Sequence, residues 1–372
     1  MSRTISMEMS RTISLAGNCL LVVGSAILFF LGVEGFLWFY AAAHKVQQPP
    51  SITAVPTPTS DEIVVPPEIV AAAKTRQQVI SMPKTWERTP TKLNGSVRMN
   101  QYYGAVHVYN QDGVRWATPF PPNREDVYRV MVVGDSLTYG AGLAEEWRFS
   151  NLLDRWMNQQ FKIEFLNLGV EGAQSEDILK IINKYLPILK PNLVIYGVCI
   201  NDFLPSGRGQ YHNTYSFPLP ARVKDFFIRH TRTGAFLSEN YDGALRRLHL
   251  RADFLDDILK DFEGYQQRFA KDVADMNRSL RVAGLPPMIG MVLEQYPDYG
   301  GRGYQIAKIA ESVLAQAGAV VIPTEDYFRR YHGRAMNISR WEGHPNEVAN
   351  YLWANMLAKE LRARHDLDSF KK

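Results

Sequence analysis

A serine and a histidine about two hundred residues apart are the first pair in this sequence that could do chemistry. Ser136 lies in the run Gly134-Asp135-Ser136-Leu137, directly after the apolar stretch 128–133. A serine hydroxyl is a weak nucleophile until a base takes its proton, and imidazole titrates near neutral pH. His344, in Gly343-His344-Pro345-Asn346, is therefore the candidate base. Such a pair can attack an acyl carbonyl.

Other glycine and polar residues follow two further predicted strands. Gly172 comes after the second strand, and Asn201 and Asp202 come after the third. A Gly-Asp-Ser run alone is most often only a turn. Open α/β sheets, however, build their sites at the carboxyl ends of strands, so several such residues at one sheet edge favour a site. We expect Asp135 to cap the segment after it and Asp202 to fix the loop that presents Asn201.

The elements that must position these residues alternate between strands and helices. Short β-branched runs predict strands, and a 3.6-residue period predicts helices. Five strands alternating with helices imply a three-layer α/β fold, with a parallel sheet covered on both faces. Strands are expected at 128–133, 163–168, 193–199, 288–293 and 319–322, and helices at 149–161, 175–186, 253–283, 304–317 and 346–364. A hairpin with strands 106–109 and 114–116 around the turn 110–113 should open the domain.

Over about residues 102–364 the sequence resembles the SGNH/GDSL hydrolase family, which includes the GDSL-like lipases and esterases. Four blocks carry the resemblance in order: Gly134-Asp135-Ser136-Leu137, Asn167 to Gly172, Gly197 to Asp202 and Gly343-His344-Pro345-Asn346. The resemblance implies a flavodoxin-like sheet in which the strands before Ser136 and Asn201 are neighbours. It also implies ester hydrolysis through an acyl-enzyme. The oxyanion hole would consist of the backbone N–H groups of Ser136 and Gly172 and the side-chain amide of Asn201.

The sequence departs from the family at the acid that orients the histidine. The family usually has an aspartate three residues before the histidine, where this chain has Trp341. Glu342, two residues before His344, is the candidate that we carry forward as the third catalytic residue. The alternatives are a backbone carbonyl in a Ser-His dyad, or Glu325 or Asp326 approaching through space.

Residues 15–33 predict a membrane span. They include no formal charge, and the apolar character resumes at 35–43 after Glu34. Nineteen helical residues rise about 28 Å, close to the roughly 30 Å of a hydrocarbon core. A signal peptide cleaved near Ala41 and Ala43 is the alternative. We favour an uncleaved single-pass anchor with the amino terminus inside and the rest outside, in the periplasm or extracellular space.

Three segments are therefore expected along the chain. Residues 1–45 form the cytoplasmic tip and anchor, and the Pro-rich residues 46–101 form a loosely packed linker. Residues 102–366 form the hydrolase domain, with an insertion at about 203–250. Tyrosines at 210–215 and 296–299 would either line a sugar-binding cleft or simply pack over the sheet.

Composition excludes several classes of function. The 42 basic and 38 acidic residues are mixed without a basic stripe, which argues against a nucleic-acid partner. The two cysteines, Cys19 and Cys199, allow neither a disulfide framework nor a cysteine zinc site. The histidines lack metal-ligand spacing, so no metal or other cofactor is expected. The expected partners are the membrane, through the amino-terminal helix, and a small-molecule, glycan or lipid ester as substrate.

Three functions remain open at this point. The first is a serine-dependent esterase, deacetylase or lipase-like acyl hydrolase that acts outside the cytoplasm. The second uses the same acyl-enzyme but passes the acyl group to a hydroxyl of a cell-envelope glycan, as an O-acyltransferase. The third is a binding module whose catalytic set has decayed at the acid position.

Overall fold

The computed structural model describes residues 22–40, 64–79, 91–93, 97–102, 105–110, 113–115, 120–207, 220–248, 254–293, 301–323, 336–339 and 342–372. They fall into two compact units. The first unit comprises Met1–Lys45 and Tyr215–Ala244, and the second comprises Val46–Thr214 and Leu245–Lys372.

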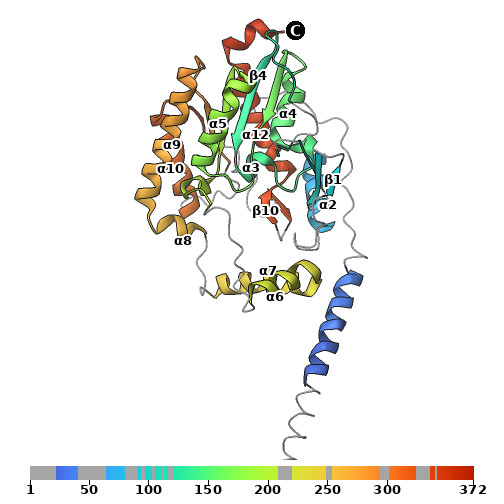
Figure 1. Ribbon diagram of the computed structural model, residues 1–372. Coiled ribbons are helices and arrows are strands. Elements are labelled where there is room, and N and C mark those ends of the chain that lie inside the picture. The colour runs from blue at the N-terminus through green and yellow to red at the C-terminus, as the bar shows by residue number, and fades with distance from the viewer. Residues whose placement is uncertain are drawn as a thin grey trace, which may run out of the picture. The chain divides into compact units, whose positions relative to one another are not determined.

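A parallel sheet forms the centre of the second unit. Its strands are β4 (Tyr128–Gly134), β5 (Ile163–Asn167), β6 (Leu193–Val198), β7 (Ile289–Val292) and β8 (Val320–Ile322). Within the described residues, their order is β5-β4-β6-β7-β8, and every neighbouring pair is parallel (Figure 1). This is the flavodoxin-like order 2-1-3-4-5, so the predicted fold class is confirmed. The strand order reverses between β4 and β6, which is where such sheets bind their ligands.

Helices cover both faces of this sheet. They include α4 (Phe149–Met157), α5 (Ser175–Leu189), α9 (Phe262–Val282), α10 (Arg302–Gln316) and α12 (Glu347–Arg362). Figure 1 shows α5, α9 and α10 on one side and α4 and α12 on the other. Val130 and Val132 of β4 belong to the core on the α4 and α12 side, whereas Met131 and Val133 belong to the core on the other side. This alternation is what a strand buried on both faces requires.

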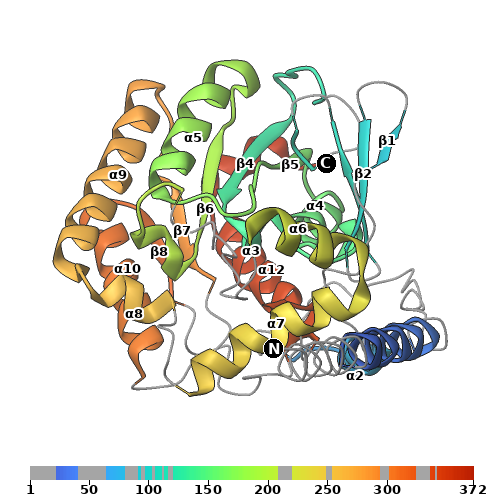
Figure 2. The ribbon, with the colours of Figure 1, turned by 60° about the horizontal axis from the view of Figure 1, so that its bottom comes forward.

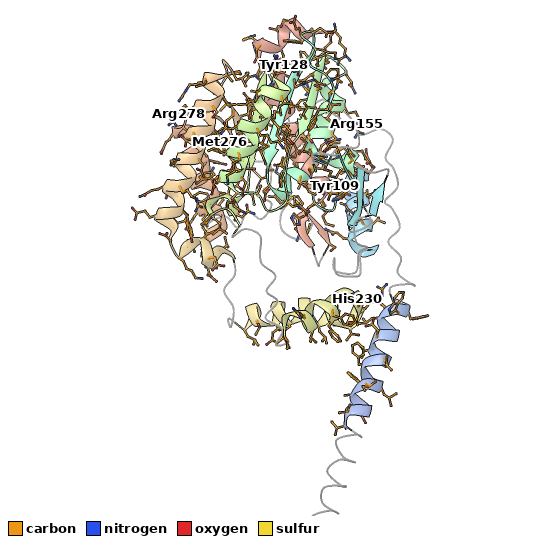
Figure 3. The ribbon with its side chains drawn as sticks, in the orientation of Figure 1. Tyr109, Tyr128, Arg155, His230, Met276 and Arg278 are labelled. Atoms are coloured by element: carbon orange, nitrogen blue, oxygen red, sulfur yellow. The ribbon has the colours of Figure 1, made fainter. Side chains whose placement is uncertain are left out.

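The predicted helix 253–283 is divided into α8 (Phe254–Leu259) and α9. The division falls at Asp261, whose backbone is non-helical with φ −141° and ψ 51°. Along α9 the faces separate by chemistry: Met276 is fully buried, whereas Arg278 forms an ion pair with Asp275 at the surface. Figure 3 shows Met276 on the inner side of α9 and Arg278 on the outer side.

Helix α5 extends beyond the expected range 175–186 and includes a proline. At its start, the Asp177 side chain accepts a hydrogen bond from the Gln174 amide at 3.3 Å. Pro187 lies inside the helix, which ends only at Leu189. The next residue, Lys190, adopts a left-handed conformation with φ 46° and closes the helix. The sequence-based end at Leu186 was therefore three residues short.

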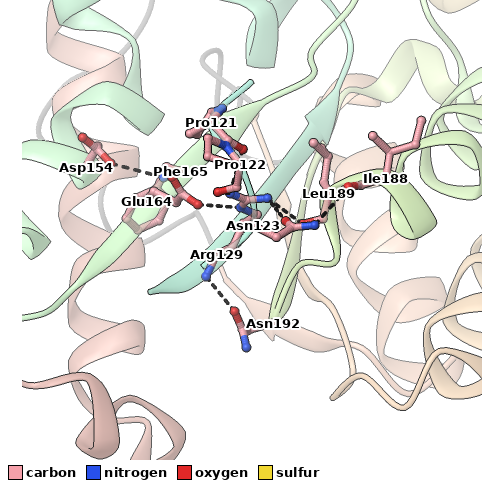
Figure 4. A network of polar contacts seen from close by, with 10 residues as sticks. All are labelled: Pro121, Pro122, Asn123, Arg129, Asp154, Glu164, Phe165, Ile188, Leu189 and Asn192. Atoms are coloured by element: carbon pink, nitrogen blue, oxygen red, sulfur yellow. Dashed lines mark hydrogen bonds and ion pairs between the residues drawn. The ribbon is translucent and has the colours of Figure 1, made fainter. Parts of the chain in front are cut away.

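Arg129 ties together the amino-terminal edge of the sheet, far from the site described below. Its guanidinium pairs with Glu164 of β5 at 2.5 Å and donates to the Leu189 carbonyl at the end of α5 at 2.8 Å. It also donates to the carbonyls of Pro121 and Pro122 at 3.0 and 2.9 Å (Figure 4). A buried arginine is stabilised in this way because its donors meet fixed oxygen atoms.

A helix lies inside the stretch 46–101 that was expected to be a linker. Helix α2 (Pro67–Val79) buries Ile69 and Ala73 in the same core as α12. Arg76 forms an ion pair of 2.6 Å with Glu347 at the start of α12, and both side chains are almost fully buried. This segment is thus part of the folded unit, because its apolar and charged side chains find partners far along the chain.

The strand at 106–109 pairs differently from the hairpin that was expected. Strand β3 (Ala105–Tyr109) pairs antiparallel with β2 (Val97–Tyr102), which in turn pairs with β1 (Thr91–Leu93). The turn at Asn110 is present, with the Gly113 amide donating to the Asn110 carbonyl at 3.1 Å. Residues 113–115 after it form bends and not a strand, so the second arm of the hairpin is corrected at these residues. Trp116 lies outside the described residues.

The described residues of the first unit form helices and the short connections between them. The helix Val22–Tyr40 is long and apolar enough, with a mean hydropathy of 2.0, to cross a membrane, and no other described helix meets that measure. Helices α6 (Ala221–His230) and α7 (Arg232–Arg247) occupy the predicted insertion. They meet at a tight corner, where a Cβ on Gly234 would collide with the Phe227 carbonyl. Ala41 and Ala43 lie outside the described residues.

Candidate active site

Ser136 begins the short helix α3 (Ser136–Tyr139), directly after β4. Asp135 caps this helix, as predicted: its Oδ1 accepts a hydrogen bond from the Leu137 amide at 2.9 Å. The backbone at Gly134 lies very close to β6, because a Cβ on Gly134 would collide with the Gly197 carbonyl oxygen. Ser136 itself is partly exposed. The view in Figure 2 brings the carboxyl ends of the strands forward, with α3 near the middle of the domain.

The loop after β5 fastens α3 from one side. Asn167 donates through Nδ2 to the Thr138 carbonyl at 2.8 Å, and its Oδ1 accepts from the Gly169 amide at 2.9 Å. A Cβ on Gly169 would collide with the backbone of Tyr139. The asparagine and the glycine of this block therefore act on the position of the serine-bearing helix.

A buried cluster fastens α3 from the other side. Arg115 is almost fully buried and donates to the carbonyls of Tyr139, Gly140 and Leu143, two of them at 3.2 and 2.7 Å. Arg148 donates to the Arg115 carbonyl at 3.1 Å. Burial and Arg115 lower the pKa of Arg148 to about 9. Sequence reasoning missed both arginines, because nothing in the local pattern distinguishes a buried arginine from an exposed one.

Three aromatic side chains, those of His107, Tyr109 and Tyr139, also belong to this cluster. The Tyr139 hydroxyl is 2.8 Å from His107 Nδ1 and also contacts the Tyr109 hydroxyl. Burial, followed by the positive charges of Arg115 and Arg148, lowers the pKa of His107 to about 2. His107 is therefore neutral at physiological pH and serves as a packed, hydrogen-bonded residue.

Asn201 lies beside Ser136. It belongs to the short 3₁₀ helix η3 (Ile200–Phe203) after β6, and it donates through Nδ2 to Asp135 Oδ2 at 3.2 Å. The register explains the proximity, since Gly134 pairs with Gly197 across β4 and β6. Asp135 Oδ2 also accepts from the Ser136 hydroxyl at 3.2 Å. One carboxylate thus connects the serine and the asparagine.

Asp202 holds the loop of Asn201, as predicted. Its Oδ2 accepts from the Cys199 amide at 3.1 Å and from the Tyr196 hydroxyl at 2.7 Å. Asp202 is fully buried, and burial together with the charge of Asp135 raises its pKa well above the usual value. Its role is therefore to shape the loop.

Gly172 lies in the turn after β5, with a left-handed φ of 74° that favours glycine. Its carbonyl accepts from the Gln174 side chain at 2.8 Å. The same loop is joined to the serine turn, because the Val170 amide donates to the Gly134 carbonyl at 3.0 Å. Gly172 is thus on a loop that the structure connects to the Ser136 turn.

His344 lies on a two-stranded ribbon formed by β10 (Glu342–Pro345) and β9 (Asn337–Ser339). Asn346 fixes the end of this ribbon, since it caps α12 through the Val348 amide at 3.0 Å and donates to the Asn337 carbonyl at 3.1 Å. Helix α3 and strand β10 contact each other. The charge of His344 acts on Asp135, where it favours the ionised carboxylate. The elements carrying Ser136 and His344 are therefore neighbours.

The charge state of Asp135 reflects two opposing effects. Complete burial raises the pKa of its carboxyl. The Leu137 amide, the charge of His344, the Cys199 thiol and the Asn201 amide lower it by less, so the pKa of Asp135 stays above its usual value. A buried carboxylate surrounded by donors in this way is a fixed acceptor at the centre of the candidate site.

The side chains of the candidate acids for His344 lie outside the described residues. The backbone of Glu342 belongs to β10, but its side chain lies outside the described residues. Glu325 and Asp326 also lie outside them, as do the tyrosines at 210–215 and 296–299. In the described part of the chain, no three His, Cys, Asp or Glu side chains are grouped as metal ligands.

Residues 132–352 match the sequence profile of the GDSL-like lipase/acylhydrolase family, which is more than half of the chain. The chain belongs to this family. It is accordingly an ester-bond hydrolase of the SGNH/GDSL type, as the sequence blocks predicted. The match includes all four blocks, from the Ser136 turn to the His344 ribbon.

Solved structures of the family resemble this GDSL hydrolase at low identity. TesA shares 17% identity with a TM-score of 0.40, and the alignment covers 63% of this chain and 98% of TesA. The psychrotrophic esterase EstA from Pseudoalteromonas sp. shares 15%, with a TM-score of 0.39 and coverage of 63% and 96%. Axe2, an acetylxylan esterase from Geobacillus stearothermophilus, shares 13%, with a TM-score of 0.40 and coverage of 63% and 94%. No curated protein matches the sequence.

Proposed function

We propose that this GDSL hydrolase cleaves a carboxylic ester through a covalent acyl-enzyme, with Ser136 as nucleophile and His344 as its base. One observation carries the proposal. Helix α3, which begins with Ser136, contacts strand β10, which bears His344, at the switch point of the sheet. Neighbouring strands also bring Asn201 to the carboxylate that accepts from the serine hydroxyl.

The chemistry follows from these positions. His344 takes the proton of the Ser136 hydroxyl as Oγ forms a bond to the ester carbonyl carbon. The imidazolium then gives the proton to the departing alcohol as the carbon–oxygen bond breaks. Water, activated by the same imidazole, releases the acid and restores the serine.

Three groups would receive the negative charge on the carbonyl oxygen. They are the backbone N–H groups of Ser136 and Gly172 and the Nδ2 of Asn201. One Asn201 hydrogen is used by Asp135, which leaves the second for the substrate. In the structure the serine hydroxyl donates to Asp135. Rotation about its Cα–Cβ bond would turn it towards His344 for reaction.

Glu342 remains our proposal for the group that orients His344. Its position in β10, two residues before the histidine, supports this role because both residues belong to one short strand. A Glu342→Gln variant tests it: the rate should fall steeply, since loss of the acid's charge in a full triad lowers turnover by about 10⁴-fold. An unchanged rate would leave a Ser-His dyad, or Glu325 or Asp326 as the acid.

We further propose that the reaction takes place outside the cytoplasm on a small-molecule, glycan or lipid ester near the membrane surface. The helix Val22–Tyr40 supports an anchor by its length and composition. Arg3 and Arg11 precede the helix, which favours a cytoplasmic amino terminus. Protease added to spheroplasts, whose outer membrane has been opened, should then digest the hydrolase domain, and full protection of the domain would reverse the orientation.

The catalytic assignment is tested with full-length protein in detergent and p-nitrophenyl acetate. Ser136→Ala and His344→Ala should each lower kcat by about 10³-fold or more. Ser312→Ala and His365→Ala, which change the same residue types at exposed positions, should leave the rate unchanged. Equal hydrolysis by the wild type and both site variants would refute the assignment. Inactive wild-type protein would favour the decayed binding module.

The same preparation separates hydrolysis from transfer. Glycan acceptors are added, and acylated sugar is sought by mass spectrometry. Release of free acid only, at an unchanged rate, supports the hydrolase. Acylated sugar that depends on Ser136 would instead indicate an O-acyltransferase that modifies a cell-envelope glycan.

A further inference from the structure

Glu34 is the single charged residue of the apolar helix Val22–Tyr40. A carboxylate within a membrane span carries a free-energy cost, which is about 2.5–3.5 kcal/mol or more at the centre of the bilayer. Acidic residues are therefore rare in such spans unless they have partners. The hydrogen-bond partners of Glu34 therefore indicate which segment the apolar helix binds.

Those partners are the first residues of α7. Glu34 accepts from the amides of Arg232 and Thr233 at 2.8 and 2.7 Å, and from the Thr233 hydroxyl at 2.7 Å. The first-turn amides of a helix have no partner within that helix, and its amino end is partially positive. Glu34 thus caps α7 from another helix, almost two hundred residues away in the sequence.

Aromatic contacts reinforce this junction. The Arg232 guanidinium lies 4.4 Å from the ring centre of Trp38, and the rings of Phe30 and Phe227 are 5.2 Å apart. Both contacts join the apolar helix to the α6–α7 pair, residues 221–247. In Figure 1 this pair runs across the direction of the apolar helix, and Figure 3 labels His230 at the corner between α6 and α7.

The position of Glu34 in the apolar helix indicates how deep the α6–α7 pair lies in the bilayer. Glu34 precedes Tyr40 by six residues, which is about 9 Å along a helix. Amphipathic helices that lie in a membrane surface bury their apolar face by roughly 5–10 Å. A span ending near Tyr40 would therefore hold α6 and α7 at the boundary between headgroups and acyl chains.

The composition of the pair suits that boundary. Val223, Phe226 and Leu237 are exposed large apolar residues, and Phe226 is 63% exposed. Residues 220–248 also include six arginine or lysine residues against three acidic ones. Exposed apolar groups together with excess positive charge are typical of helices that bind anionic lipid surfaces.

We propose that the α6–α7 pair is a second membrane-binding element, which lies in the anionic surface layer of the bilayer that the apolar helix spans and is held at that depth by Glu34. The proposal depends on the anchor but not on the chemistry of Ser136. In the sequence, this pair belongs to the insertion that follows the 3₁₀ helix of Asn201.

The test measures depth in full-length protein reconstituted into vesicles of phosphatidylcholine and phosphatidylglycerol. A polarity-sensitive fluorophore is attached to Phe226→Cys in a background with Cys19→Ala and Cys199→Ala. Ile188→Cys, on an apolar side chain that is 55% exposed in the hydrolase domain, is the matched control. We expect blue-shifted emission at 226 that lipids brominated near the headgroup quench, and neither effect at 188.

A second comparison tests whether Glu34 holds the α6–α7 pair in the membrane surface. Glu34→Ala removes the cap and should reduce quenching at 226, while the protein stays resistant to carbonate extraction. Replacement of phosphatidylglycerol by phosphatidylcholine should also reduce quenching. Emission at 226 that matches the 188 control in carbonate-resistant protein would overturn the proposal.

If protein instead of lipid covers Phe226, the experiment gives a different result. A blue shift without quenching by brominated lipid would mean that protein, either the hydrolase domain or a second copy, covers Phe226, and the proposal would be wrong. Loss of the protein to carbonate extraction would overturn both the anchor and this proposal, whereas p-nitrophenyl acetate hydrolysis would still report on Ser136 independently.

Discussion

At the scale of single residues, Asp135 is the centre of the candidate site. It is fully buried and accepts from the Leu137 amide, the Ser136 hydroxyl and the Asn201 side chain. Buried carboxylates are tolerated when donors surround them, and each donor is then held in place. Asp135 therefore both caps α3 and fixes the distance between two of the groups proposed to act on the ester.

Asn201 gives the sharpest kinetic prediction. Its amide is proposed to receive charge that develops only in the transition state, so Asn201→Ala should lower kcat by about 10²–10³-fold with little change in KM. Steady-state kinetics with p-nitrophenyl acetate measure this split. An increase in KM at unchanged kcat would mean that Asn201 only binds the ground state.

Asp154 allows a prediction about pH. Burial, with a smaller effect of the charge of Glu164, raises its pKa from 3.8 to about 6. Between these values the unfolded chain binds fewer protons than the folded one, so the group lowers stability as pH rises from about 4 to 6. Asp154→Asn should remove this loss and raise the free energy of unfolding at pH 7 by about 3 kcal/mol.

Thermal unfolding of both proteins from pH 4 to pH 8 measures the effect. The gain in Tm should be absent near pH 4 and complete at pH 7. The amide oxygen of the variant can still accept from the Phe165 amide, which Asp154 contacts at 3.2 Å. Asp126→Asn, at an exposed side chain, is the control and should leave the pH dependence unchanged. A constant difference at all pH values would mean that titration of the buried carboxyl is not the cause.

At the scale of elements, α3 is only four residues long and depends on its neighbours. Isolated helices of this length do not persist in water. Asn167 fastens it from the β5 side, and Arg115 fastens its last carbonyls from the other. Presentation of Ser136 is therefore a property of the loops and the buried arginine around the helix.

Arg115→Ala should destabilise the fold by about 3 kcal/mol or more. The variant leaves the carbonyls of Tyr139, Gly140 and Leu143 without the guanidinium, and each unsatisfied buried group costs roughly 1–3 kcal/mol. Urea unfolding followed by circular dichroism measures the change. Arg278→Ala, at the surface of α9, should stay within about 0.5 kcal/mol of the wild type. Equal effects of the two variants would contradict the conclusion that Arg115 stabilises the residues around α3.

At the scale of the whole molecule, the packing of α2 shows where the folded unit that contains the candidate site begins. Ile69 and Val65 are buried with the residues of α12, and Arg76 pairs with Glu347. Glu347 is three residues after His344, so α2 supports the end of the histidine ribbon. The hydrolase domain of this chain thus includes helix α2, well before residue 102.

Truncation tests this boundary. A chain that begins at Val64 retains α2, whereas a chain that begins at Met82 loses it. The shorter chain should be less stable by several kcal/mol, since each buried Ile or Val contributes about 1.5–3 kcal/mol and an unpaired buried carboxylate costs about 3–5 kcal/mol. Tm and soluble yield compare the two. Equal Tm values would show that α2 is dispensable.

Much of this architecture could be read from the sequence alone. The strands near Ser136 and Asn201 and the helices between them have strong local periodicity, so all five sheet strands were predicted to within about two residues. The four blocks also indicated the family, because a serine, a glycine and an asparagine after three predicted strands, followed by a histidine before the last helix, are a specific combination. Helix ends were less predictable, as at Pro187, because packing outweighs local propensity.

Only the tertiary structure decided which distant groups meet. No local pattern reveals that Arg115 is buried under α3, that Arg76 pairs with Glu347, or that Glu34 caps α7. Each of these contacts joins residues that are far apart in the chain or depends on burial, and burial belongs to the folded molecule and not to the residue type. The sequence determined the family and the positions of the sheet strands along the chain, whereas the fold decided which charges are paired and which segments belong to the core.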